Sequence, residues 1–152
     1  MMPDETDATL SPAEARDLRR IAGMMIPASP EHDVPGADDP AIFADILRSL
    51  GRDAAELRAA LAALAERGGG AFAALDAAGA EAVAGAFLGS GTAATLGRVI
   101  LQCYYRDDRV LRALGIAPRP PFPTGHVLEQ GDWSLLAPVR ARPPLWRDDR
   151  RG

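Results

Sequence analysis

The sequence predicts an all-α protein: a single helical domain of about seven helices, followed by a proline-rich, extended C-terminal arm. Apolar residues recur at three- and four-residue spacing up to about residue 117, and no useful stretch alternates as a half-buried strand does. From residue 118 onward lie seven of the 13 prolines and both tryptophans. We therefore expect a disordered lead over residues 1–10, a helical domain over 11–117 and a partner-binding arm over 118–152.

The first helix is predicted from its cap. Ser11, Pro12 and Glu14 give a capping serine, a proline at the first helical position and a glutamate three residues beyond the cap. Pro27 disfavours helical geometry at the residue before it, so the helix should end there. Its apolar face carries Leu18, Ile21, Ala22 and Met25.

A second helix should follow the loop Ala28–Ala37, starting at Asp38 or Asp39 and closing at Gly51. Its predicted inward residues are Ile42, Phe43, Ile46, Leu47 and Leu50.

Asp53 and Glu56 repeat the capping-box spacing at the start of a third helix, which the glycines 68–70 should stop. Its inward stripe is Leu57, Ala60, Leu61 and Leu64. Two short helices, Phe72–Ala77 and Glu81–Leu88, are then expected on either side of Gly79.

The stretch from Thr92 to Gly125 holds the most regular helix pattern, with one apolar face formed by Leu96, Val99, Ile100, Cys103 and Tyr104. Asp107 or Asp108 can cap a shorter helix with inward Val110, Leu111 and Leu114, and Gly115 offers a left-handed stop. In the arm, Asp132 is expected to cap a short helix through Leu135 and Leu136, with Pro138 limiting it. The remainder of the arm should be extended.

The composition of the chain limits the classes of function that can be expected. Apolar residues make up 47% of the 152, but many are alanine and only 5% of the chain is aromatic, so the core should be thin and could gain stability from a partner. A net charge of −4 gives no electrostatic reason to expect nucleic acid or an anionic membrane. With one cysteine and neither a signal-peptide pattern nor a transmembrane run in the sequence, a cytoplasmic protein is the default expectation.

No pattern indicates chemistry by this chain alone, and we expect no catalytic, cofactor-binding or metal-binding residues. Gly89–Thr92 resembles a phosphate cradle, but no strand precedes it and no lysine ends it, so a helix break is the better interpretation. His32, His126 and Cys103 do not have zinc-site spacing. Ser90, His126 and an aspartate could be assembled into a triad, but no nucleophile elbow surrounds the serine.

Partner binding is the more probable use of the exposed aromatic and arginine residues. Tyrosine, tryptophan and arginine are common interface anchors. For Trp133, binding a partner and covering the chain's own core are equally good interpretations, whereas Trp146, beside two prolines and two arginines, favours a partner. The predicted partner-binding residues are Pro35, Tyr105, Arg119, Phe122, Trp133, Arg142 and Trp146.

Several short motifs resemble a known family. Leu10–Glu14, Ile26-Pro27 and Pro35–Ala37 resemble the start of the gluconate 2-dehydrogenase subunit 3 family. Tyr104–Asp107, with Leu114-Gly115, Pro123 and Gly125, looks like that family's second characteristic block. The resemblance covers residues 10 to about 126, and the middle matches only in helical character.

This resemblance implies a small accessory subunit that assists the folding, stability or export of a large FAD-dependent dehydrogenase of the glucose–methanol–choline class. FAD would belong to that large partner, which would oxidise a sugar or polyol. Many such subunits carry a twin-arginine signal, which this sequence lacks, so a cytoplasmic two-subunit complex is the expectation. The alternatives are a helical adaptor or regulator with an unrelated partner, and a small enzyme or ligand-binding protein using His32 or His126.

Overall fold

The computed structural model describes residues 10–119, 125 and 130–143. The chain divides into two compact units, Met1–Pro118 and Arg119–Gly152, which are considered separately below. The all-α prediction is confirmed: the described residues hold seven α-helices and five short 3₁₀ helices, and their one β-type pairing is an isolated bridge between Ser29 and Val34. The α-helices are α1 Pro12–Met25, α2 Pro40–Arg48, α3 Ala54–Arg67, α4 Ala77–Leu88, α5 Ala94–Tyr104, α6 Asp108–Ala113 and α7 Ala137–Arg140.

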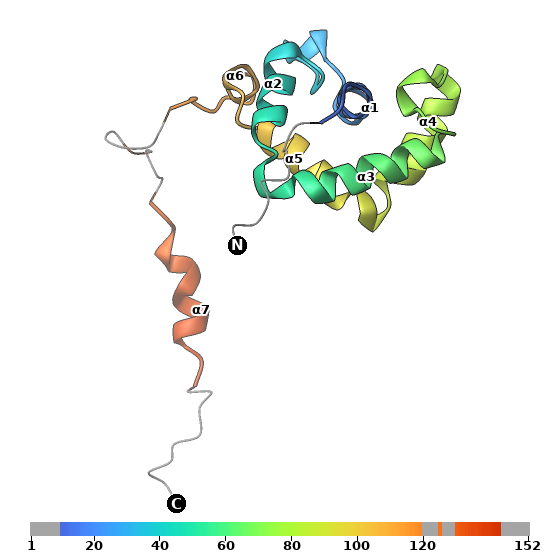
Figure 1. The fold of residues 1–152 in the computed structure, drawn as a ribbon. Coiled ribbons are helices and arrows are strands. Elements are labelled where there is room, and N and C mark those ends of the chain that lie inside the picture. Colours follow the sequence, from blue (N-terminus) through green and yellow to red (C-terminus); the bar gives the residue numbers. More distant parts are fainter. Residues whose placement is uncertain (1–9, 120–124, 126–129, 144–152) are drawn as a thin grey trace, which may run out of the picture. The chain divides into compact units, whose positions relative to one another are not determined.

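Within the first unit, α3 is the central helix and packs against α1, α4 and α5, while α2 packs against α5 (Figure 1). The core between these helices is aliphatic, with two phenylalanines. Its largest fully buried side chains are Phe72, Phe87, Leu18, Ile21, Ile42, Ile46, Leu50, Leu57, Leu61, Leu64, Leu96 and Ile100.

The start of α1 has the predicted capping box. The Glu14 backbone N–H donates to the Ser11 hydroxyl at 3.3 Å, and the Ser11 N–H donates to the Glu14 carboxylate at 2.7 Å. Hydrogen bonds from Ser11 lower the pKa of the Glu14 carboxyl. The helix ends at Met25, as the proline two residues later predicts.

Helix α2 is capped by Asp39, which accepts hydrogen bonds from the backbone N–H groups of Ala41 and Ile42. The prediction that Leu47 faces inward is wrong, because its side chain is 37% exposed. Consecutive helical residues are about 100° apart, so Leu47 points well away from the direction of the buried Ile46.

The capping box predicted for α3 is also wrong. A 3₁₀ turn, Gly51–Asp53, runs directly into the helix, so Asp53 already has helical backbone angles and makes no side-chain cap. Its carboxylate instead pairs with Arg98 at 2.8 Å, and Glu56 accepts a hydrogen bond from the Thr95 hydroxyl at 2.8 Å. Both acids therefore tie α3 to α5.

Helix α4 continues through Gly79, where the sequence predicted a break. Asp76 has extended backbone angles and caps the helix by accepting from the Gly79 N–H at 2.8 Å. The expected helix Phe72–Ala77 is a single 3₁₀ turn, Phe72–Ala74. The cap outweighs the low helix propensity of one glycine in the first turn.

All five residues predicted for the inner face of α5 are buried. Asp107 caps α6 by accepting from the Arg109 N–H at 2.9 Å, and Gly115 adopts the expected left-handed angle, φ +75°. Val110 is buried, but Leu114 is 56% exposed and not inward as predicted, because it lies just beyond the helix end.

The second unit holds a 3₁₀ helix, Trp133–Leu136, that continues into α7. Asp132 caps it as predicted, accepting from the Ser134 N–H at 2.9 Å. Pro138 does not limit the helix, since it lies in the first turn of α7, where a missing N–H costs no hydrogen bond. The helix predicted through Leu136 therefore continues to Arg140, where the sequence analysis expected extended chain.

Among the described residues, no single helix is long and apolar enough to cross a membrane. One sharply bent pair, α4 with the segment Gly91–Tyr104, meets the length and composition criteria together.

Candidate functional site

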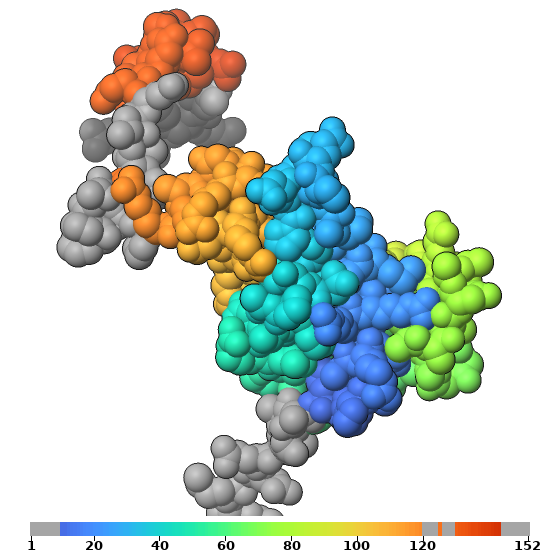
Figure 2. Space-filling model, turned by 90° about the horizontal axis from the view of Figure 1, so that it is seen from above, coloured from blue at the N-terminus to red at the C-terminus, as the bar shows by residue number. Residues whose placement is uncertain are grey.

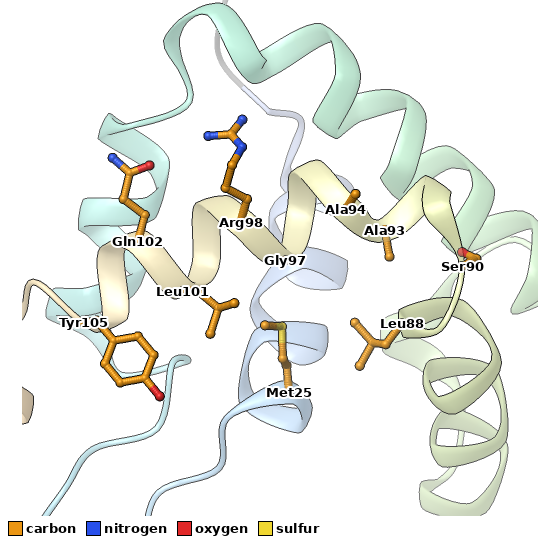
Figure 3. Close-up of a pocket in the computed structure, with 10 residues that line it drawn as sticks. All are labelled: Met25, Leu88, Ser90, Ala93, Ala94, Gly97, Arg98, Leu101, Gln102 and Tyr105. Atoms are coloured by element: carbon orange, nitrogen blue, oxygen red, sulfur yellow. The ribbon is translucent and has the colours of Figure 1, made fainter. Parts of the chain in front are cut away.

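An open, mostly apolar groove of about 820 Å³ runs along α5 (Figure 3). The C-terminal ends of α1 and α4 contribute Met25 and Leu88, whose side chains point toward the same space as Leu101. The groove is lined by Met25, Leu88, Ser90, Ala93, Ala94, Gly97, Arg98, Leu101, Gln102 and Tyr105.

The groove follows a second stripe of α5, distinct from the buried one. Gly97, Leu101 and Tyr105 recur every four residues and so share one side of the helix. Gly97 has no side chain, so the floor of the groove is low at this position. A Cβ added there would lie 3.9 Å from the Met25 methyl group, its nearest neighbour. Leu101 is 39% exposed and Tyr105 52% exposed, so two large apolar side chains face solvent.

The adjacent tyrosines Tyr104 and Tyr105 have opposite environments, as the sequence predicted. Their rings meet edge to face, with centroids 5.2 Å apart. Tyr104 is 5% exposed, and its burial is the main cause of a raised phenol pKa. Tyr105 extends to the end of the groove opposite Ser90 (Figure 3).

Two polar side chains at the groove's edge, Arg98 and Ser90, already have partners. Arg98 pairs with Asp53, and in Figure 3 its side chain points away from Leu101. The Ser90 hydroxyl donates to the Phe87 carbonyl at 2.6 Å. The groove therefore offers mainly apolar surface to a ligand.

A polar cluster lies where α2 meets α6, and Arg109 is its centre. Its guanidinium donates to both carboxylate oxygens of Asp39, at 2.7 and 3.2 Å, and to both of Asp107, at 3.0 Å each. These bonds lower the pKa of each carboxyl and raise that of Arg109. Because each aspartate also caps a helix, Arg109 joins the starts of α2 and α6.

A second arginine, Arg106, joins the end of α5 to α2. Its Nε donates to Asp45 at 2.7 Å, and its Nη2 contacts the Ser49 hydroxyl and, at 3.6 Å, the Cys103 sulfur. Burial raises the pKa of the Cys103 thiol. A protonated, buried thiol is a poor nucleophile.

The two predicted partner-binding residues of the helical unit, Pro35 and Tyr105, line different hollows. Tyr105 lines the groove, whereas Pro35 lines a separate hollow with Arg109. In the second unit, Arg119 and Arg142 are exposed and Trp133 is 66% exposed. Phe122 and Trp146 lie outside the described residues. Tyr105 is thus the one predicted residue in the groove; its other lining residues were not predicted.

A signal for the groove was present in the sequence. The stripe that carries Leu101 and Tyr105 repeats at helical spacing, but the buried face of the same helix has the stronger pattern. Met25 was assigned to an inner face, and it is partly buried and lines the groove.

Of the residues considered for catalysis, the described Ser90 and His32 line separate hollows. His32 is exposed beside Asp33 and Arg112, far along the chain from Ser90, and His126 lies outside the described residues. The Gly89–Thr92 segment follows a helix rather than a strand, which agrees with a helix break. Within the described parts of the chain, no three metal-ligating side chains converge.

Comparison with known proteins adds no relative: no family model, curated protein or solved structure matches the chain.

Proposed function

We propose that this chain is a non-catalytic accessory subunit that binds a large FAD-dependent dehydrogenase of the glucose–methanol–choline type through the α5 groove. The observation that carries the binding role is the groove itself, with Leu101 and Tyr105 exposed over a floor of alanine and glycine. An open apolar surface of this kind is typical of a protein–protein contact. The identity of the partner rests on the family resemblance of the short motifs.

The polar chemistry of the helical unit favours a structural role. Arg106 and Arg109 use their donors on helix-capping and helix-face carboxylates, and the Ser90 hydroxyl bonds to its own backbone. The two arginines therefore stabilise junctions between helices, and the Ser90 hydroxyl stabilises the end of α4, so none of these groups is left for catalysis. In this proposal FAD binding and sugar or polyol oxidation belong to the large subunit.

The test is co-expression with the product of any neighbouring reading frame that encodes a large protein with a dinucleotide-binding glycine fingerprint. Affinity capture of the small chain should bring down the large one, and the eluate should show flavin absorbance. Leu101→Glu should weaken association about thirtyfold or more, which corresponds to about 2 kcal/mol, the scale of an interface hot spot.

Leu47→Glu is the matched control, because Leu47 is 37% exposed against 39% for Leu101 but lies on α2, outside the groove. This variant should bind like the wild type. Capture of a different protein through the same groove, without the flavoprotein, would support the adaptor alternative instead. Equal loss in both variants would show that the groove is not the contact.

A further inference from the structure

The two helices that border the groove are anchored to very different extents. Helix α5 buries five side chains, whereas α4 fully buries Ala80, Ala84 and Phe87, of which only the phenylalanine is large. Most of the remaining α4 residues are exposed alanine and glycine. In Figure 2, α4 forms a yellow-green lobe at the edge of the helical unit, beside α1.

Helix α4 buries little apolar surface. Hydrogen bonds and cation–π contacts from arginine side chains therefore supply much of the attachment of α4 and the residues before it. Arg20 of α1 donates to the backbone carbonyls of residues 72, 73, 75 and 76, at 2.6–3.2 Å, just before α4 begins. Its guanidinium also lies 5.5 Å from the centre of the Phe72 ring. One turn earlier on α1, Asp17 accepts from the Ala73 N–H at 2.7 Å.

At the other end of α4, Arg67 of α3 donates to the Ala86 carbonyl at 3.5 Å and lies over the Phe87 ring at 5.8 Å. The first contact is at the limit of a hydrogen bond and the second is at the outer range of a cation–π interaction. Apart from the burial of Phe87, the end of α4 that carries Leu88 into the groove is therefore held only by marginal polar contacts among those described.

We propose that α4 is a locally unfolding wall of the groove, which separates from the rest of the helical unit with loss of its helical hydrogen bonds and is held closed chiefly by the Arg20 contacts. Opening exposes one large buried side chain, Phe87, together with the partly buried Val83 and Leu88 and the part of α3 that packs against α4. Helices α3 and α5 each keep most of their buried side chains. Local openings of this kind occur at elements with few buried apolar contacts. The inference deepens the proposed function, since such a wall would adjust the groove to the docked subunit.

Hydrogen exchange of the isolated full-length chain tests the proposal without any partner. Amides of α4 should exchange at least tenfold faster than those of α3 and α5. Arg20→Gln should speed α4 exchange about tenfold further and leave α5 unchanged, because net hydrogen bonds from a charged donor are worth about that factor. Arg16→Gln is the control, since Arg16 is exposed on α1 and makes no hydrogen bond or ion pair with the described residues.

Gly85→Ala should shift the opening equilibrium of α4 toward the closed state. A Cβ at Gly85 meets nothing within 4 Å, so alanine adds helix propensity to α4 without a new contact and should slow its exchange about fivefold. Equal exchange rates in α3, α4 and α5 of the wild type would overturn the proposal. So would a Gly85→Ala variant whose α4 exchange is unchanged, even if Arg20→Gln fails to fold. Either result would leave the docking role of the groove standing.

Discussion

Helices α4 and α5 are nearly equal in length and border the same groove, yet they are built from different side chains. Helix α5 places leucine, valine, isoleucine, cysteine and tyrosine in the core, whereas α4 places two alanines and one phenylalanine there. Hydrophobic stabilisation grows with the apolar area buried. The groove therefore has one firmly anchored side and one loosely anchored side, and the difference follows from side-chain size alone.

The largest effect should come from removing a buried side chain of α5. Ile100 is fully buried, and Ile100→Ala should lower the free energy of unfolding by about 3 kcal/mol, by lost burial and a new cavity. Val83→Ala, at a partly buried position of α4, should cost about 1 kcal/mol or less. Urea unfolding of both variants checks this, and similar costs would contradict the contrast between the helices.

Substitutions of the two neighbouring tyrosines at the end of α5 should distinguish an effect on stability from an effect on binding. Tyr104→Ala should lower the unfolding free energy by about 3 kcal/mol, because it empties a buried site. Tyr105→Ala should leave the melting temperature almost unchanged but weaken binding to the large subunit by about 2 kcal/mol. Thermal melts and binding titrations on both variants test the pair. A lowered melting temperature with unchanged affinity in Tyr105→Ala would contradict the assignment of Tyr105 to partner binding.

The buried face of α5 could be predicted from the sequence, but the groove that α4 and α5 border could not. The buried face of α5 was predicted in full, because five large apolar residues recur at helical spacing and burial decides their position. The capping box at Ser11 was equally clear, since both of its bonds are local. Local patterns with strong energetic consequences are the ones that sequence analysis identifies.

The errors occur where distant contacts compete with local ones. Asp53 and Glu56 have capping-box spacing, but Arg98 and Thr95 of α5 bind them instead. The Arg20 contacts span more than 50 residues of sequence and follow no spacing rule. The groove forms where the ends of α1 and α4 meet the length of α5, so the pattern of α5 alone could indicate its exposed stripe but not Met25 or Leu88.

Acid should weaken the α2–α6 junction but not the contacts that Arg20 makes before α4. The pKa values of Asp39 and Asp107 are lowered by Arg109, so their stabilisation is complete above the ordinary value near 4 and is lost as the pH falls through the lowered values. Arg109→Gln should therefore make the unfolding free energy fall less steeply below about pH 4.

Arg20→Gln should leave that acid slope unchanged, because the acceptors of Arg20 are carbonyl oxygens, which do not titrate. Urea unfolding at a series of pH values measures all three slopes. An identical slope in the wild type and Arg109→Gln would show that the pairs around Arg109 do not stabilise the fold.

The smallest effect on stability is expected in the second unit. Trp133 is 66% exposed, so Trp133→Ala should change the melting temperature of the helical unit by no more than corresponds to about 0.5 kcal/mol. A large drop would mean that this tryptophan covers the core, which is the other interpretation of the sequence. Trp146→Ala, predicted to weaken association by about 2 kcal/mol, concerns a residue outside the described ones.

The central claim is that a large flavoprotein subunit docks on the α5 groove, and hydrogen exchange with and without that subunit tests it most directly. The account predicts slower exchange on binding in the peptides that line the groove, around residues 21–26, 86–90 and 93–105, and no change across α2 at residues 40–48. Protection confined to α2 or to the loop 28–37, with the groove peptides exchanging as in the free chain, would contradict it.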